Sequence, residues 1–124
     1  MTTFTSAKAL NEPTVLVEFE GEPVRVPAGL TVAAALLGHT DAGAFCSNSA
    51  DGSERAPHCL MGVCFECLVE IDGIPNRQAC LTPVAEGMVI RTNSPRALEA
   101  RRVNMELILS QHDNKGWARG LKAC

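Results

Sequence analysis

The sequence predicts a single α+β domain, because 124 residues hold one modest core and because strand-like and helix-like segments follow one another. Apolar and polar residues alternate over 15–19 and 24–26, as they do in half-buried strands. Asp72 and the glycine after it form a strong signal for a second hairpin. Ser94 and the proline after it combine a cap with a first-turn residue, which predicts the start of a helix.

The first half of the chain is predicted to hold an extension, a hairpin and a helix. Residues 1–13 form a flexible N-terminal extension. The first hairpin turns at residues 20–22. Thr31 caps an alanine-rich helix over residues 32–37, and Gly38 stops it. Because this helix is apolar on all sides, we expect it to be buried across a sheet.

The second half begins with a segment of different character. Residues 39–58 are rich in turn formers and predict a long irregular segment, whose place directly before the cysteine motif favours a functional role. Strands are predicted over residues 68–71, 77–81 and 88–91. A helix is then predicted over residues 95–110, and the tail after it is expected to be loose.

Four cysteines carry most of the functional information. Cys59, Cys64 and Cys67 have the C-x4-C-x2-C spacing of a plant-type [2Fe–2S] site, and Cys80 follows after twelve intervening residues. The second hairpin returns Cys80 to the end of the sheet where Cys67 lies. Gly62 can adopt a positive φ and bring backbone N–H groups close to the sulfurs. The pattern predicts a one-electron site and therefore a role in electron transfer.

Five neighbours of these cysteines also have expected roles. Leu60, Met61, Val63 and Phe65 are expected to form an apolar shell that limits the access of solvent to the sulfurs. His58 immediately precedes the motif and is expected to be an ordinary loop residue, with a hydrogen bond near the cluster or a mixed ligand set as the alternatives. A Rieske centre needs two histidines on one iron, and the motif has no second histidine nearby.

Other uses of the cysteines stay open at this point. A structural zinc site typically has two separated C-x2–4-C pairs, and here only Cys64 and Cys67 have that spacing. A thioredoxin-type redox pair and disulfides are further alternatives, although the flanking pattern and the expected compartment do not favour them. Cys46 is the alternative fourth ligand to Cys80, and Cys124 is expected to be an incidental thiol.

Composition and charge exclude several classes of function. The formal charge of −3 argues against a nucleic-acid partner, and the basic group of Arg96, Arg101 and Arg102 is interpreted as a solvated helix face. The sequence has no run of about 18 apolar residues, so no membrane span is predicted. No secretory signal is visible at the N-terminus, so a cytoplasmic protein is expected. Motifs for hydrolytic catalysis or phosphate binding are also missing, so we expect no substrate site in this chain.

The order of the predicted elements, together with the cysteine motif, resembles the β-grasp fold of [2Fe–2S] ferredoxins. Residues 27–37, 55–73 and 77–88 resemble the short ferredoxin-like small subunits of flavin-dependent amine and imino-acid dehydrogenases. Hydrogen cyanide synthase, opine oxidase or dehydrogenase, and proline or hydroxyproline dehydrogenase have such subunits. The segment 101–112 also resembles the stretch after the β-grasp domain in the large iron–sulfur subunit of respiratory complex I and in iron hydrogenases.

The resemblance implies a β-grasp domain over residues 14–92, preceded by the extension 1–13 and followed by a C-terminal helix and tail over 93–124. It implies that the four cysteines of the motif ligate one [2Fe–2S] cluster. It also implies large partner subunits that hold FAD or FMN and carry out the oxidation. Because only Cys124 follows the last helix, a second cluster is not expected.

Three functions are compatible with the sequence. The first is an electron-transfer subunit that relays single electrons from a partner's flavin, after oxidation of an amine, imino acid or opine, to an acceptor. The second is a free, diffusible ferredoxin, for which a stronger acidic excess is typical than this chain has. The third is a zinc-stabilised interaction module. The apolar face over residues 98–109 is expected either to dock a partner or to pack on the chain's own sheet.

Overall fold

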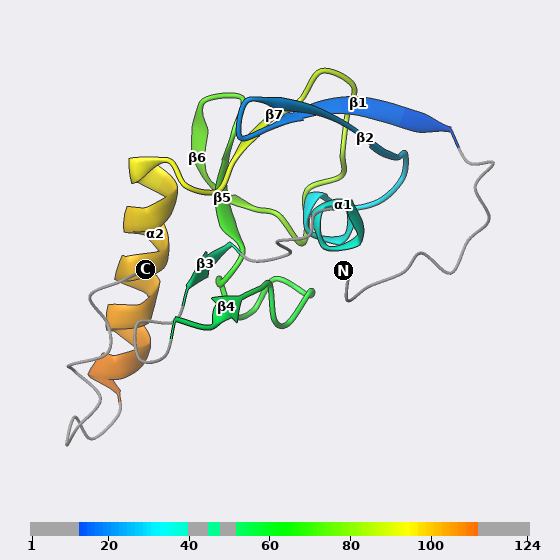
Figure 1. Cartoon of the computed structure of the whole chain (residues 1–124). Coiled ribbons are helices and arrows are strands. Elements are labelled where there is room, and N and C mark those ends of the chain that lie inside the picture. The colour runs from blue at the N-terminus through cyan, green and yellow to red at the C-terminus, as the bar shows by residue number, and fades with distance from the viewer. Residues whose placement is uncertain (1–12, 40–44, 48–51, 112–124) are drawn as a thin grey trace.

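The structure is a computed structural model that describes residues 13–39, 45–47 and 52–111, which form the two helices and seven strands of Figure 1. The strands are β1 (Thr14–Phe19), β2 (Glu22–Pro27), β3 (Cys46–Ser47), β4 (Glu54–Arg55), β5 (Leu68–Ile71), β6 (Ile74–Gln78) and β7 (Val89–Arg91). The helices are α1 (Val32–His39) and α2 (Pro95–Ser110).

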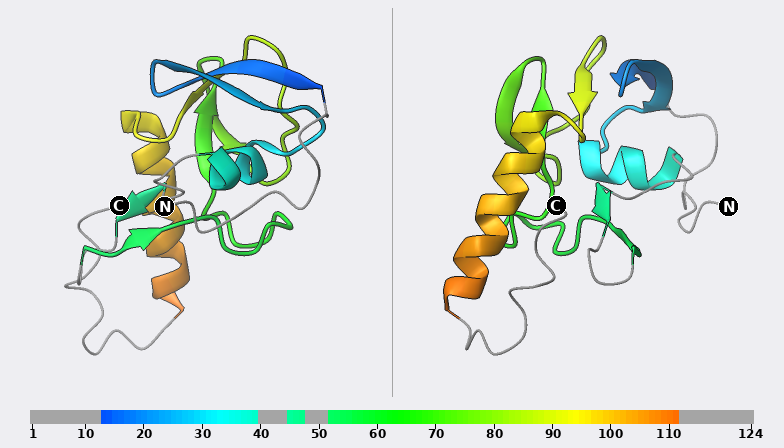
Figure 2. Two further views of the ribbon diagram at one scale, coloured as in Figure 1. Left: turned by 45° about the vertical axis from the view of Figure 1, so that its right-hand side comes forward. Right: turned by 60° about the vertical axis from the view of Figure 1, so that its left-hand side comes forward.

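Five of the strands form one mixed sheet in the order β2-β1-β7-β5-β6. Strands β1 and β7 run parallel, and the other neighbours in the sheet run antiparallel. Helix α1 packs near β2 and helix α2 runs beside β5 and β6, so the two helices cover different parts of the sheet (Figures 1 and 2). This arrangement confirms the expected α+β class with a C-terminal helix. The division of the chain at residues 13 and 92 stays a prediction.

Helix α1 is joined at its start to the turn that follows the second hairpin. Thr31 Oγ1 accepts a hydrogen bond from Ala34 N at 3.3 Å, which confirms the predicted cap. The first two helical N–H groups have no partner inside the helix, and here they donate to the Ala79 and Thr82 carbonyls at 2.9 and 2.8 Å. The helix continues past the glycine expected to stop it and ends at His39. Its buried side chains form the core together with β1, β5 and β7.

Two predicted segments differ from the structure. The segment 39–58 is not wholly irregular, because β3 and β4 pair there, with Ser47 opposite Glu54. The return strand was expected over 77–81, but β6 begins directly after the hairpin turn and ends at Gln78. Both turn residues have positive φ, which lets a two-residue turn start the pairing at once. Cys80 therefore lies in a turn beyond the strand.

The predicted start of α2 is confirmed, because Ser94 Oγ accepts a hydrogen bond from Ala97 N at 3.2 Å. The interpretation of its arginines is wrong at one position. Arg101 is 2% exposed, and its guanidinium donates to the carbonyls of Leu68 (2.7 Å), Phe45 (2.9 Å) and Thr92 (2.6 Å). These acceptors are main-chain oxygens from three separate segments, so the side chain has polar partners inside the protein.

Replacement of Arg101 by methionine should lower the free energy of unfolding by about 3 kcal/mol, because three buried carbonyl oxygens lose this donor. Chemical denaturation followed by circular dichroism measures the change. Arg102→Met is the matched control, because Arg102 is partly exposed and pairs with Glu99 and Glu106 on the helix surface. The control should unfold as the wild type does. Equal stability of the two variants would show that the buried guanidinium is dispensable.

Candidate functional site

The site lies where the loop after β4 meets the turn after β6. Cys59 and Cys64 are half-buried in the loop, whereas Cys67 and Cys80 are buried and belong to the hydrophobic core. Ala79 N donates to the Cys67 carbonyl at 3.1 Å, so the end of the second hairpin is closed at the level of these two residues. The site is therefore built with one side in the core and the other side at the surface.

The sulfur of Cys59 is surrounded by hydrogen-bond donors. The N–H groups of Met61 and Cys64 both donate to Cys59 Sγ at 3.4 Å. These two bonds, with a further one from the Cys64 thiol, lower the pKa of Cys59 to about 6. The loop thus stabilises a thiolate at this position, and the thiolate is the form of cysteine that ligates metals.

Cys67 has the opposite environment. Burial raises the pKa of its thiol to about 11, although a hydrogen bond from the Cys80 backbone acts in the other direction. The Cys80 thiol also hydrogen-bonds Cys67, and Cys64 is close enough to disfavour a second negative charge. The thiols of Cys59 and Cys64 are thus neighbours, as are those of Cys67 and Cys80, and Cys64 also lies near Cys67.

The residues at the site are of the kind that a [2Fe–2S] cluster requires. Such a cluster takes two thiolate ligands on each of its two irons, whereas a structural zinc site takes four ligands around one ion. Here the thiols of Cys59 and Cys64 are neighbours, those of Cys67 and Cys80 are neighbours, and backbone N–H groups are directed at the Cys59 sulfur. The four thiols could hold the two irons of such a cluster.

Gly62 is the point where the loop approaches the turn after β6. Its φ is +82°, and a Cβ added there would lie 2.5 Å from Leu81 Cδ1. Its carbonyl accepts a hydrogen bond from Gln78 Nε2 at 3.0 Å. The predicted positive φ is confirmed, and it permits the close approach that brings Cys59 and Cys64 to the buried pair.

The apolar side chains of the loop lie at the surface, on a short loop with several residues at positive φ. Their expected role in limiting the access of solvent to the sulfurs stays a prediction. Together with an equally exposed residue from the turn after β6 these side chains form what we call the loop surface. It consists of Leu60 (50% exposed), Met61 (67%), Val63 (67%), Phe65 (46%) and Leu81 (55%).

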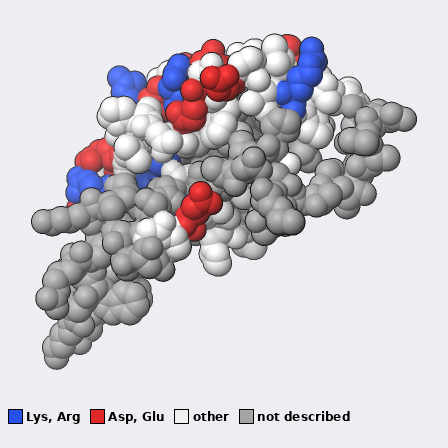
Figure 3. All heavy atoms as spheres, viewed as in Figure 1, with Lys and Arg blue, Asp and Glu red and all other residues white. Residues whose placement is uncertain are grey.

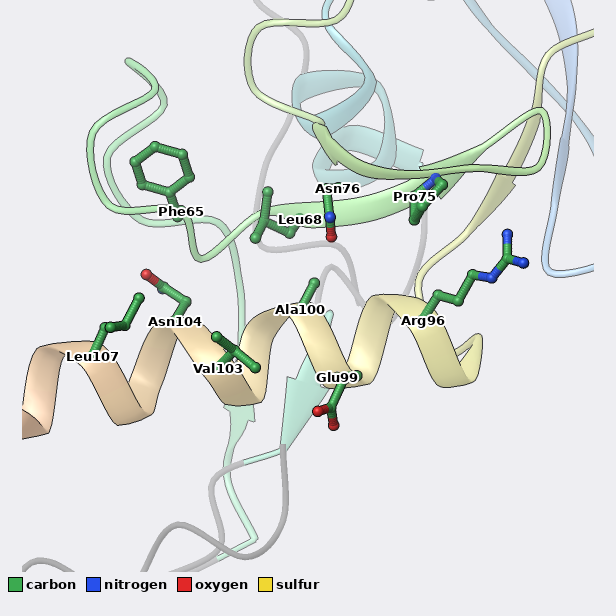
Figure 4. Close-up of a pocket in the computed structure, with 10 residues that line it drawn as sticks. All are labelled: Phe65, Leu68, Pro75, Asn76, Arg96, Glu99, Ala100, Val103, Asn104 and Leu107. Atoms are coloured by element: carbon green, nitrogen blue, oxygen red, sulfur yellow. The ribbon is translucent and has the colours of Figure 1, made fainter.

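Helix α2 also borders the site. A groove of about 640 Å³ separates α2 from the second hairpin and the loop, and its apolar part is lined by Phe65, Leu68, Val103 and Leu107 (Figure 4). The first half of α2 is anchored through buried Ala97, whereas Val103, Leu107 and Ile108 in the second half are exposed. The face over 98–109 is thus partly packed and partly exposed, and its expected role in docking a partner stays a prediction.

Two functional contacts were missed in the sequence. Asn104 Nδ2 donates to the Cys64 carbonyl at 3.1 Å. Glu66, which lies between Cys64 and Cys67 in the chain, forms an ion pair with Arg55 at 2.5 Å. The sequence carried no signal for the first contact, because its two residues are far apart in the chain. His58 is exposed. The Cys46 side chain, Cys124 and the other two histidine side chains lie outside the described part of the chain.

Comparison with known proteins identifies the family. The model of the 2Fe-2S iron-sulfur cluster binding domain matches residues 12–95. The chain belongs to this family. Its 2Fe-2S domain is 38% identical over 87 residues to the hydrogen cyanide synthase subunit HcnA of Pseudomonas aeruginosa, which covers 70% of this chain and 82% of that subunit. The expected resemblance to such an iron–sulfur subunit is thereby confirmed.

Larger proteins contain a similar 2Fe-2S domain. The chain is 35% identical over 101 residues to the NADP-reducing hydrogenase subunit HndD of Solidesulfovibrio fructosivorans, with 77% of this chain and 16% of that subunit covered. It is 35% identical over 103 residues to the mitochondrial NADH dehydrogenase [ubiquinone] iron-sulfur protein 1 of Solanum tuberosum, with 82% and 13% covered. The chain therefore spans only a small part of the length of these two relatives.

A solved structure agrees on the fold. A chain of an NAD+-reducing [NiFe]-hydrogenase in the H2-reduced state superposes with a TM-score of 0.58 at 22% identity, covering 82% of this chain and 42% of that one.

Among the described helices, neither is both long and apolar enough to cross a membrane.

Replacement of Gly62 by alanine should reduce the iron bound per chain. Alanine at this φ costs about 1–2 kcal/mol, and its Cβ would push Leu81 aside. Iron content and visible absorbance measure the loss. Gly87→Ala is the matched control, because Gly87 has a φ of +74° in open space before β7, so stability should fall similarly while iron content stays constant. Full iron content in both variants would show that the close approach of Gly62 to Leu81 is not needed for iron binding.

Proposed function

We propose that Cys59, Cys64, Cys67 and Cys80 hold one [2Fe–2S] cluster, with the first two on one iron and the last two on the other. The support is the match of residues 12–95 to the 2Fe-2S domain family, together with the neighbouring positions of the Cys59 and Cys64 thiols and of the Cys67 and Cys80 thiols. When bound, the cluster accepts and releases one electron at a time. Gly62 serves the site by letting the loop approach the turn that carries Cys80.

The residues around the sulfurs set the conditions for this electron transfer. The N–H groups of Met61 and Cys64 stabilise negative charge on Cys59 Sγ, and such bonds raise the reduction potential of iron–sulfur sites. Burial of Cys67 and Cys80 keeps water away from the inner side. The outer side is left open in this chain, because the loop surface is exposed.

The proposed role is that of an electron-transfer subunit in a heteromeric flavin-dependent dehydrogenase or oxidase of the cytoplasm. Large partner subunits would hold FAD or FMN and oxidise an amine, an imino acid or an opine. The similarity to a hydrogen cyanide synthase subunit over 82% of that subunit's length supports a small subunit of such an enzyme. A partner on the loop surface would bury exposed apolar side chains and place its own redox group near the sulfurs.

The alternative is a free, diffusible ferredoxin. Such carriers rely on a strongly acidic surface for steered, short-lived encounters. On the face shown in Figure 3, acidic and basic side chains lie beside one another instead of forming one acidic patch. The side chains of the loop surface beside the sulfurs are apolar, which favours a lasting assembly.

Isolation of the tagged chain from its own cells under anaerobic conditions tests this function. We expect a large complex on a sizing column with both flavin and [2Fe–2S] absorption. Val63→Glu should retain the cluster but reduce co-purified flavin at least tenfold, because a charge would be placed in the buried contact. Ile74→Glu is the control, since Ile74 is 55% exposed on the second hairpin and should not change the flavin content. A small iron–sulfur protein without flavin would establish the free ferredoxin instead.

A pair of cysteine variants tests the ligands. Cys80→Ser should lose the cluster or change its spectrum strongly, because serine provides a harder, more basic ligand in place of a thiolate. Cys46→Ser should keep the wild-type iron content and spectrum. Visible circular dichroism and electron paramagnetic resonance (EPR) of the reduced protein measure both. The opposite result would make Cys46 the fourth ligand.

A further inference from the structure

We propose that Asn104 on α2 is a positioning residue for the cluster, which holds the peptide between Cys64 and Phe65 and thereby raises the reduction potential. The inference rests on the proposed function, because it requires Cys64 to be a ligand. It assigns a redox role to a helix that follows the cysteine motif by almost thirty residues along the chain.

Helix α2 holds the second half of the motif at both ends. Asn104 Nδ2 donates to the Cys64 carbonyl at 3.1 Å, and Arg101 Nη1 donates to the Leu68 carbonyl at 2.7 Å. Because Arg101 and Asn104 are three residues apart, they lie on the same face of the helix. Figure 4 shows Asn104 extending from α2 toward the segment that carries Phe65. The segment 64–68 is thus fixed from one side by two hydrogen bonds.

The direction of the Cys64 carbonyl determines the direction of the next N–H group. A peptide unit is planar and trans, so its C=O and N–H point in opposite directions. Asn104 lines the groove between α2 and the loop, and none of the four site cysteines lines it. With the Cys64 carbonyl directed at α2, the Phe65 N–H is directed away from α2, and this N–H belongs to the peptide unit that directly follows the proposed ligand Cys64.

The backbone at Phe65 needs such support. Its φ is +55°, a conformation that costs a bulky side chain about 1–2 kcal/mol. Strained residues of this kind persist only where the surrounding contacts fix them. The hydrogen bond from Asn104 ends on the peptide that precedes Phe65, so its loss would free that peptide to turn over.

A turned peptide would change the field at the cluster in a defined direction. An N–H group near the sulfurs stabilises the additional negative charge of the reduced cluster, and a carbonyl oxygen in its place destabilises it. Loss of the Asn104 amide should therefore lower the reduction potential. Stability of the fold alone does not produce such a shift in a fully loaded protein.

The test is a redox titration of Asn104→Leu, a variant of similar volume without a donor, followed by EPR of the reduced cluster. At the wild-type midpoint potential, the ratio of reduced to oxidised cluster should fall by roughly fivefold, the factor that one hydrogen bond is worth. The EPR g values should shift as well. Glu106→Gln is the control on the same helix, because Glu106 is exposed and contacts Arg102; it should titrate as the wild type does.

The possible outcomes are distinct. An unchanged potential and unchanged g values in fully loaded Asn104→Leu would overturn the inference while the proposed function stands. A wild-type protein without a [2Fe–2S] spectrum would overturn the proposed function itself. If Asn104→Leu fails to retain the cluster, the redox titration is repeated with Asn104→Gln, because that variant keeps the amide donor. Wild-type behaviour of Asn104→Gln supports the inference, and loss of the cluster there too overturns it.

Discussion

The hydrogen bonds of the buried Arg101 guanidinium fix the position of helix α2 relative to the sheet and the segment before β3. The guanidinium receives no solvation from water, so the cost of burying its charge must be offset by polar partners inside the protein. Carbonyls of Phe45, Leu68 and Thr92 provide that compensation, and each belongs to a different segment. The segment before β3, the strand after Cys67 and the connection into α2 are thereby joined at one point.

This connection makes α2 part of the structure that holds the cysteines. Without it, a helix after the last strand would be an addition to a complete ferredoxin-like sheet. With it, α2 is tied to β5 at Leu68, the residue that directly follows Cys67. The helix N-terminus is held as well, since Ser94 Oγ contacts Glu70 on the same strand at 3.2 Å. The core, the helix and the loop form one mechanical unit.

Features with a strong local signal could be predicted from the sequence. The turn after Asp72, the cap at Ser94 and the spacing of the cysteines each depend on neighbours in the chain, and the structure contains the turn and the cap. Arg101 could not be placed, because a charged side chain on a helix is usually solvated and its three acceptors are distant in sequence. The contact of Asn104 with Cys64, 40 residues away, depends on the same packing and was equally invisible.

The exposure of the loop surface shows a different limit of prediction. Apolar side chains between cysteines suggest burial, but the sequence of one subunit does not reveal which surface buries them. In the structure they point outward from a loop that carries Leu60, Gly62 and Phe65 at positive φ. The same residues that were expected to close the site within the chain are those a partner would contact.

The unequal burial of the four cysteines has a consequence for chemical access to the site. Cys67 and Cys80 are held by the packing of core side chains and by the closure of the second hairpin. Cys59 and Cys64 are only half-buried and lie in a loop. Oxidants and chelators should therefore reach the site from the solvent side, at Cys59 and Cys64, and a partner bound over this side would protect it.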